Sequence, residues 1–281
     1  MDSWKRFKDD RLAIAGAVIV LIFTVAAIAA PLLAPFDPTE QFADGLSLQG
    51  APLPPGGKFL LGTDLLGRDL YSRLLYGARV SLLIGVIANL VAVLLGVTLG
   101  AIAGFVQGWL GEVIMRFTDL MMAFPALLLA IALAAILRPS LWIVALVIAL
   151  VNWVQIARVA YAQVTVLTEQ EHIQAAKSLG ARRSQVLRWH IIPHLVPTVL
   201  VWGTLGISIT VLQEATLSFL GVGVQPPMPS WGGIINESQS FIQSAPWLVI
   251  FPGVAILLLS LAFNLLGDGV RDAVDPTEQG R

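Results

Sequence analysis

Six long apolar runs dominate the sequence and restrict the folds open to it. Each run approaches the ~17–25 residues that a helix needs to cross a lipid bilayer. Unpaired backbone groups are costly in lipid, so such runs form helices there and not isolated strands. The expected spans cover residues 12–33, 80–106, 120–137, 141–157, 196–213 and 247–266. The sequence therefore predicts an all-α, polytopic helix bundle of about six transmembrane helices, a single domain over residues 1–281.

Composition agrees with a membrane protein and removes several classes of function. Hydrophobic residues make up 57% of the chain and charged residues only 12%, against roughly a quarter charged in an average soluble domain. The net charge of −1 gives no basic surface for nucleic acid. Because the chain has no cysteine, a disulfide framework, a thiolate metal site and a cysteine nucleophile are all excluded.

The first apolar run has two readings. Its basic flank and the small residues Ala27 and Ala29 resemble a secretory signal with a cleavage site. The run from Leu12 to Leu33 is nevertheless long enough to cross roughly 30 Å of hydrocarbon. We therefore expect an uncleaved first helix.

Lysines and arginines predict the orientation, because positive residues near span ends tend to stay in the cytoplasm. They flank the first span and fill the connection between the fourth and fifth spans, at Lys5, Arg6, Lys8, Arg11, Arg158, Lys177, Arg182, Arg183 and Arg188. The segment 35–79, which this orientation places outside, also carries four basic residues, at Lys58, Arg68, Arg73 and Arg79. The placement of most of the basic residues predicts cytoplasmic termini, a cytoplasmic segment 168–193, and external segments 35–79 and 221–246.

The cytoplasmic segment has a regular pattern. Apolar Ala175, Ala176 and Leu179 lie opposite polar Gln174, Lys177 and Ser178, which predicts a short amphipathic helix. Gly180 can end this helix in a left-handed cap, and helical periodicity resumes over 182–192. Such a rigid elbow between two spans can dock in a groove of a soluble partner. Amphipathicity alone also fits a helix lying on the lipid surface.

Motifs in this and other segments resemble a known family. QAAKSLG followed by IIP resembles the EAA motif of permease subunits of bacterial ABC importers, with Gln174 in place of the motif's Glu, His190 in place of its first Ile and Ile192 in place of its Leu. Segments 62–82 (GTDLLGRDLYSRLLYGARVSL), 213–233 (QEATLSFLGVGVQPPMPSWGG) and 263–276 (FNLLGDGVRDAVDP) are similar to the C-type subunit of dipeptide/oligopeptide/nickel permeases.

This resemblance implies a type I ABC importer permease of the bacterial inner membrane. It implies pairing with a second, related permease, two ATP-binding subunits that dock below, and an extracytoplasmic substrate-binding protein. The implied cargo is a di- or oligopeptide, and relatives with the same signatures handle nickel complexes or glutathione-like peptides. The motif carries the docking role over to Glu171, Ala175, Ala176, Lys177, Leu179, Gly180 and Ala181.

No catalytic or cofactor site is expected. The sequence has no G-x4-GK[ST] string for binding phosphate, so ATP and Mg²⁺ are expected on partner chains. His190 and His194 have i, i+4 spacing, but Ile191 stands where a zinc-binding HEXXH motif needs glutamate. We therefore expect no metal site, and a membrane enzyme would need converging catalytic side chains that are not found.

Glu214 supports an alternative class. An acidic residue near the membrane interior is costly, which suggests a translocation path or an inter-subunit contact; it is a simple interfacial residue if the fifth span ends before it. A stand-alone secondary transporter would need such ionisable residues near the midplane.

Other polar or small residues within spans are assigned to helix packing, at Asn89, Gly96, Gly100, Gly104, Asn152 and Asn264. The spacing of Asp64, Arg68, Asp69 and Arg73 predicts ion pairs along an external helix.

Overall fold

The computed structural model describes residues 7–137 and 140–274. The described residues form helices joined by loops, with isolated β-bridges and no strand. The helices are α2 (Arg11–Ile28), α3 (Ala30–Leu33), η1 (Ala43–Gly45), α4 (Leu70–Val106), α5 (Gly108–Met122), α6 (Ala126–Ile136), α7 (Leu141–Thr168), α8 (Glu171–Ser178), α9 (Arg183–Val186), η2 (Leu187–Ile191, a π-helical turn), α10 (Ile192–Phe219), α11 (Trp231–Ser238), η3 (Gln239–Phe241) and α12 (Trp247–Val274). The all-α prediction is confirmed.

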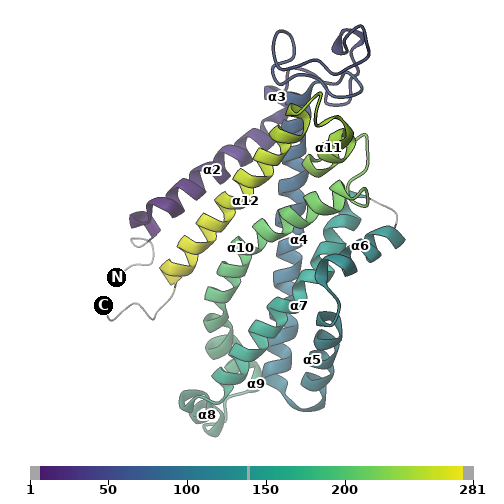
Figure 1. The fold of residues 1–281 in the computed structure, drawn as a ribbon. Coiled ribbons are helices and arrows are strands. Elements are labelled where there is room, and N and C mark those ends of the chain that lie inside the picture. The colour runs from purple at the N-terminus through teal and green to yellow at the C-terminus, as the bar shows by residue number, and fades with distance from the viewer. Residues whose placement is uncertain (1–6, 138–139, 275–281) are drawn as a thin grey trace.

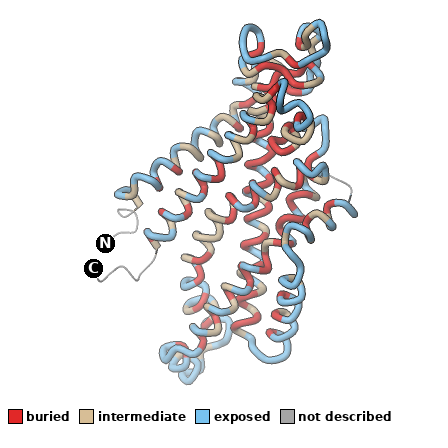
Figure 2. The backbone as a smooth tube through the Cα atoms, viewed as in Figure 1, coloured by how far each residue is buried: buried red, intermediate tan, exposed pale blue. Residues whose placement is uncertain are grey.

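The long helices form a bundle with two distinct ends (Figure 1). Helix α4 runs through its centre, α7 packs along it, and α2 and α12 lie side by side and lean away from the rest. One end carries the loops of residues 35–69, which we call the outer cap, together with α11, while the other end carries α8. Buried residues concentrate on α4 and α7, whereas α2 and α8 are largely exposed (Figure 2).

Among the described residues, five helical segments are long and apolar enough to cross a membrane, and a sixth span results if α5 and α6 are counted together. This pair is bent by 88° at a short break. The expected continuous span over 120–137 is therefore wrong. Pro125 explains the break, since proline lacks the donor for a helical hydrogen bond and disfavours helical geometry at the preceding Phe124.

Helices α4, α7, α10 and α12 extend beyond the spans expected from the apolar runs, whereas α2 ends at Ile28, short of the expected residue 33. Helix α4 begins at Leu70, inside the segment 35–79 expected as an external connection, because the Asp69 side chain accepts a 2.7 Å hydrogen bond from the Ser72 amide. Helix α7 continues past residue 157 to Thr168, and α10 continues past residue 213 to Phe219. The apolar runs therefore mark only part of each of these helices, which continue into more polar sequence.

Glycines on one face of α4 allow it to touch α7 closely. A Cβ atom at Gly96 would lie 2.6 Å from the Trp153 carbonyl oxygen, and one at Gly104 would lie 2.9 Å from that of Tyr161. A Cβ atom at Gly100 would overlap the Ala157 carbonyl. Real Cβ atoms do not approach so closely, so only glycine permits this backbone approach. The packing role predicted for these glycines is confirmed.

Ion pairs join the outer cap to the bundle. The Arg68 guanidinium contacts Asp64 at 2.6 Å and Glu237 of α11 at 2.8 Å, and Arg73 contacts the same two carboxylates at 3.2 and 3.0 Å. The expected pairing of Asp64 with Arg68 is present, but it lies in a turn and not on a helix. Gly67 has a φ of +72° there, which only glycine adopts readily.

Candidate functional site

Helix α8 is anchored to the bundle by one buried side chain. Ile173 is fully buried in an apolar cluster that also contains Ala101 of α4 and Val164 of α7. The cluster is completed by residues from the segments that follow α8, namely Val186, Ile191 and Leu195. The elbow is therefore packed against three long helices and does not hang as a free loop.

Gln174 adds a polar link to the end of α7. Its side-chain Nε2 donates a 2.8 Å hydrogen bond to the backbone carbonyl oxygen of Thr168. The Thr168 hydroxyl in turn accepts a 3.4 Å hydrogen bond from the side-chain Nε2 of Gln107. Gln174 stands where the EAA motif has glutamate, and a carboxylate could not donate this bond. The glutamine is thus suited to its local contact.

Gly180 ends α8 in the predicted left-handed cap. Its φ is +85°, its amide donates to Lys177 O at 3.0 Å, and the Ala181 amide donates to Ala176 O at 3.1 Å. These two bonds define a Schellman motif, which satisfies carbonyls at a helix end. The cap fixes the angle at which the chain leaves α8.

The outward side of α8 is open and partly apolar. Leu179 is 89% exposed, and the neighbouring Ala175 is also exposed. Glu171 lies in the first helical turn and Lys177 in the last, where their charges complement the helix dipole. The structure thus brings the seven predicted docking residues together at one end of the molecule, with Glu171, Ala175, Lys177, Leu179 and Gly180 exposed and Ala176 and Ala181 half-buried.

Three histidines lie close together at this elbow, and the sequence did not predict their arrangement. The His172 ring lies 6.2 Å from the His190 ring and 6.3 Å from the His194 ring, centroid to centroid. His194 Nδ1 lies 2.7 Å from the His190 carbonyl oxygen. Within the described residues, no group of three or more histidine, cysteine or acidic side chains is arranged to hold a metal ion. The short helical spacing of His190 and His194 was visible in the sequence, but the approach of His172 was not.

Glu214 lies inside the chain's own bundle. Its carboxylate is fully buried and accepts 2.8 Å hydrogen bonds from the hydroxyls of Ser81 on α4 and Ser218 on α10. Helix α10 continues past Glu214 to Phe219, and the reading of Glu214 as an interfacial residue stays a prediction. Its predicted place in a path or at a subunit contact stays a prediction. Nearby, Asn152 and Gln213 exchange amide hydrogen bonds of 2.7 and 3.0 Å, as expected of packing residues.

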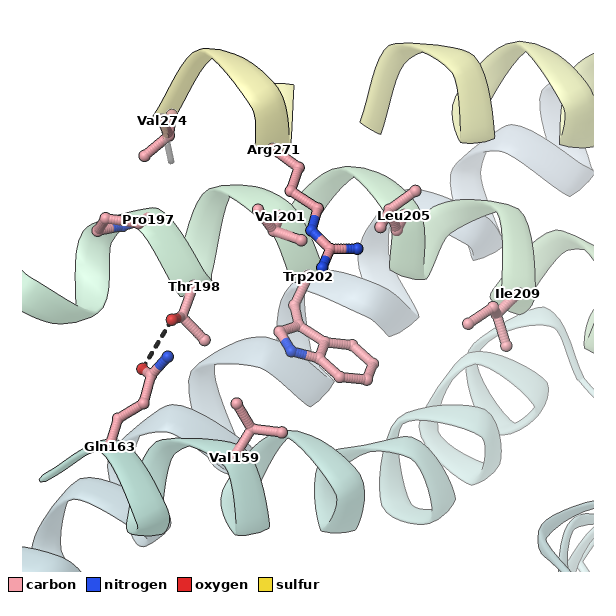
Figure 3. Close-up of a pocket in the computed structure, with 10 residues that line it drawn as sticks. All are labelled: Val159, Gln163, Pro197, Thr198, Val201, Trp202, Leu205, Ile209, Arg271 and Val274. Carbon is pink, nitrogen blue, oxygen red and sulfur yellow. Dashed lines mark hydrogen bonds between the residues drawn. The ribbon is translucent and has the colours of Figure 1, made fainter. Parts of the chain in front are cut away.

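A groove of about 490 Å³ opens between α7, α10 and α12 (Figure 3). Thr198 donates a 2.7 Å hydrogen bond to the Gln163 side chain at one end of it. The Arg271 side chain extends from α12 toward α10 and Trp202. The groove is lined by Val159, Gln163, Pro197, Thr198, Val201, Trp202, Leu205, Ile209, Arg271 and Val274.

The long apolar helices of this all-α bundle are those of a polytopic membrane protein, and comparison with known proteins gives its family. Residues 96–279 match the family model described as binding-protein-dependent transport system inner membrane component. Residues 1–55 match the N-terminal transmembrane domain of oligopeptide transport permease C. The chain therefore belongs to this family of multi-pass inner-membrane permeases of ABC importers, in the branch of the peptide permease C subunits, as the sequence motifs predicted.

Relatives within the family agree closely in length. The chain is 44% identical to the dipeptide transport system permease protein DppC of Alkalihalophilus pseudofirmus, over 98% of this chain and 89% of that protein. It is 42% identical to the di/tripeptide permease DppC of Pseudomonas aeruginosa (98% and 91% covered) and 40% identical to the glutathione permease GsiD of Escherichia coli (99% and 91% covered).

A solved structure gives the fold. A chain of the MetNI methionine ABC transporter in an inward-facing conformation aligns with a TM-score of 0.60 at 17% identity, covering 72% of this chain and 97% of that one. The predicted type I ABC importer permease architecture is confirmed.

Proposed function

We propose that this chain is the permease subunit of an importer that uses ATP hydrolysis by partner subunits to carry di- or oligopeptides across the inner membrane by alternating access. The single observation that carries the proposal is the construction of α8. Its inner side is fixed by buried Ile173, and its outer side presents Leu179, which is 89% exposed. A partner that grips this surface can move the long helices without first unfolding the elbow.

The proposed arrangement of partners follows from the family. Two ATP-binding subunits, one of them on α8, hold ATP and Mg²⁺, while a second, related permease and an extracytoplasmic substrate-binding protein complete the importer. This chain carries no catalytic step of its own. We place α8 and both termini in the cytoplasm and the outer cap on the opposite side, as the distribution of lysine and arginine favours.

Cysteine substitutions test docking and orientation together, because the chain has no cysteine of its own. Leu179→Cys gives a unique thiol on α8, and Leu48→Cys gives its matched control at a fully exposed position of the outer cap. In the assembled importer, an amine- and thiol-reactive cross-linker is expected to join position 179, but not position 48, to an ATP-binding subunit.

Labelling of the same variants in intact cells tests the orientation. A membrane-impermeant maleimide is expected to label position 48 from outside and position 179 only after the membrane is opened. Labelling of position 179 from outside would overturn the proposal, since an ATP-binding subunit has no access to that side.

Peptide cargo is supported by the names of the similar permeases, which cover dipeptides, di/tripeptides and glutathione. Glutathione and nickel complexes remain the alternative cargoes within the proposal. Mass spectrometry of the molecule retained by the co-purified binding protein decides among them. A stand-alone secondary transporter is disfavoured by membership of the family, and it would show uphill uptake under a proton gradient without ATP.

A further inference from the structure

The groove between α7, α10 and α12 has one polar end and one apolar end (Figure 3). Gln163 of α7 and Thr198 of α10 lie at one end, and the Arg271 guanidinium lies farther along the groove, beside Trp202. Beyond Arg271 the wall of α10 continues with Leu205 and Ile209. A ligand with a charged head and an apolar tail matches this order.

Arg271 is the charged group of the groove. It lies in the last turns of α12, and within residues 7–137 and 140–274 no ion pair or hydrogen bond engages its guanidinium. Asp268 and Asp272 are its neighbours on α12, and neither forms an ion pair with Arg271 in the part of the chain that the structure describes. Arg271 is therefore free to bind an anion, and a guanidinium favours phosphate through its fork of donors.

The length of the groove fits one leaflet of a membrane. The wall from Pro197 to Ile209 covers roughly 18 Å at the 1.5 Å rise per residue of an α-helix, and half of the hydrocarbon core is about 15 Å deep. Trp202 lies beside Arg271, and tryptophan is enriched at the level of lipid head groups.

We propose that the groove binds an anionic phospholipid, with the phosphate on Arg271 and one acyl chain along Val201, Leu205 and Ile209. The leaflet is the one on the side of α8, so this inference rests on the orientation in the proposed function. Basic pockets between transmembrane helices on the cytoplasmic side are suited to anionic head groups.

A peptide fits the groove less well. Its backbone amides would meet the apolar wall of Leu205 and Ile209 without hydrogen-bond partners, which is costly. A helix of the second permease could fill an apolar groove, but it would need an acidic side chain opposite Arg271. The experiment below treats both occupants as outcomes.

Trp202 serves as a reporter for the test. The assembled importer is reconstituted in nanodiscs with phospholipids brominated on the acyl chain, either phosphatidylglycerol or phosphatidylcholine. The signal of Trp202 is the difference in quenching between the wild type and Trp202→Phe. We expect phosphatidylglycerol to half-quench this signal at a mole fraction about fivefold lower than phosphatidylcholine, the ratio that one interfacial cation supplies.

Variants assign the preference to Arg271. Arg271→Gln is expected to remove the fivefold difference, and Arg271→Lys is expected to keep most of it. Arg11→Gln is the matched control, because it removes one exposed positive charge at the start of α2, outside the groove. Inorganic phosphate at millimolar concentration is expected to leave the preference unchanged, since it brings no acyl chain.

Three results would overturn the inference. Equal quenching by both lipids in the wild type removes the anionic preference, absence of quenching by either lipid shows that the second permease covers the groove, and loss of quenching on addition of peptide cargo assigns the groove to cargo. ATP-driven peptide uptake is measured in parallel vesicles. If uptake persists while the lipid preference is absent, only the lipid inference fails.

Discussion

The side-chain amide of Gln174 donates a 2.8 Å hydrogen bond to the backbone carbonyl of Thr168 and so ties α8 to the end of α7. Gln174→Glu is expected to lose this bond, because a carboxylate has no proton to donate at neutral pH. A typical hydrogen bond contributes about 0.5–1.5 kcal/mol. Hydrogen exchange of residues 171–178 should therefore become roughly two- to tenfold faster.

Gln174→Met is the control for this variant, since it keeps the length of the side chain and adds no charge. It should show most of the same acceleration. Unchanged exchange in both variants would mean that the contact does not stabilise α8.

Gly180 sets the exit angle of α8 through its φ of +85°. A β-branched residue in this conformation costs roughly 1–2 kcal/mol, so Gly180→Val is expected to unwind the cap and weaken the coupling of ATP hydrolysis to peptide uptake in vesicles. Gly180→Asn is the matched control, because asparagine tolerates the left-handed region. Full coupling in the valine variant would show that the cap is dispensable.

Glu214 connects α4 and α10 through the hydroxyls of Ser81 and Ser218. Glu214→Leu leaves both buried hydroxyls without this partner, at a cost of about 1–3 kcal/mol for each unsatisfied group. We expect a lower melting temperature of the purified importer, followed by tryptophan fluorescence. Glu214→Gln retains hydrogen-bonding atoms at the same place and should melt near the wild type; equal melting of all three proteins would contradict the assigned role.

Glu237 lies between two arginines, with Arg68 and Arg73 at 2.8 and 3.0 Å. Both guanidinium groups are buried, so Glu237→Gln leaves two cations sharing Asp64 alone. Breaking a buried pair costs about 3–5 kcal/mol, and the partial exposure of Glu237 reduces this to roughly 1–3 kcal/mol. The outer cap should become several-fold more sensitive to limited proteolysis.

Lys58→Met provides the comparison for Glu237→Gln. Lys58 and Asp44 form a pair on the exposed surface of the same cap, and such exposed pairs contribute little to stability. Proteolysis at wild-type rates is expected for this variant. A larger effect for Lys58→Met than for Glu237→Gln would reverse the assigned importance of the two pairs.

The ion pair between Lys58 and Asp44 predicts that the stability of the outer cap depends on pH. The hydrogen bond from Lys58 holds the pKa of the Asp44 carboxyl below its ordinary value. A lowered folded-state pKa contributes stability above the unfolded value, about 3.9 for aspartate, and this contribution is lost as the pH falls through the folded-state pKa. The rate of cleavage within residues 44–58 by an acid protease should therefore rise more steeply below pH 4 in the wild type than in Asp44→Asn. Parallel plots of cleavage rate against pH for the two proteins would contradict this prediction.

Local patterns in the sequence predicted most of the long helices and the cap of α8. Apolar runs located the bundle, and Gly180 adopts the predicted left-handed conformation, because helix periodicity and left-handed caps depend on neighbours within a few residues. The break at Phe124–Pro125 was also visible in the sequence, but the uninterrupted apolar run around it led to the wrong prediction of one continuous span.

Contacts between distant residues could not be predicted in this way. Ile173 is buried by Ala101 and Val164, and Glu214 is bound by Ser81, which precedes it by 133 residues. Such contacts depend on how whole helices pack, and no single segment carries a signal for them. The place of Glu237 beside Arg68 was missed for the same reason.

Helix α4 links the two ends of the molecule mechanically. It is roughly 55 Å long at 1.5 Å per residue, with Arg73 in the ion pairs of the outer cap at one end and Ala101 in the cluster around Ile173 near the other. Its glycine face holds α7 against it backbone to backbone, so the two helices resist sliding past each other. We therefore expect a displacement of α8 to tilt α4 as one rigid body. The tilt changes the position of the outer cap at the other end of the bundle.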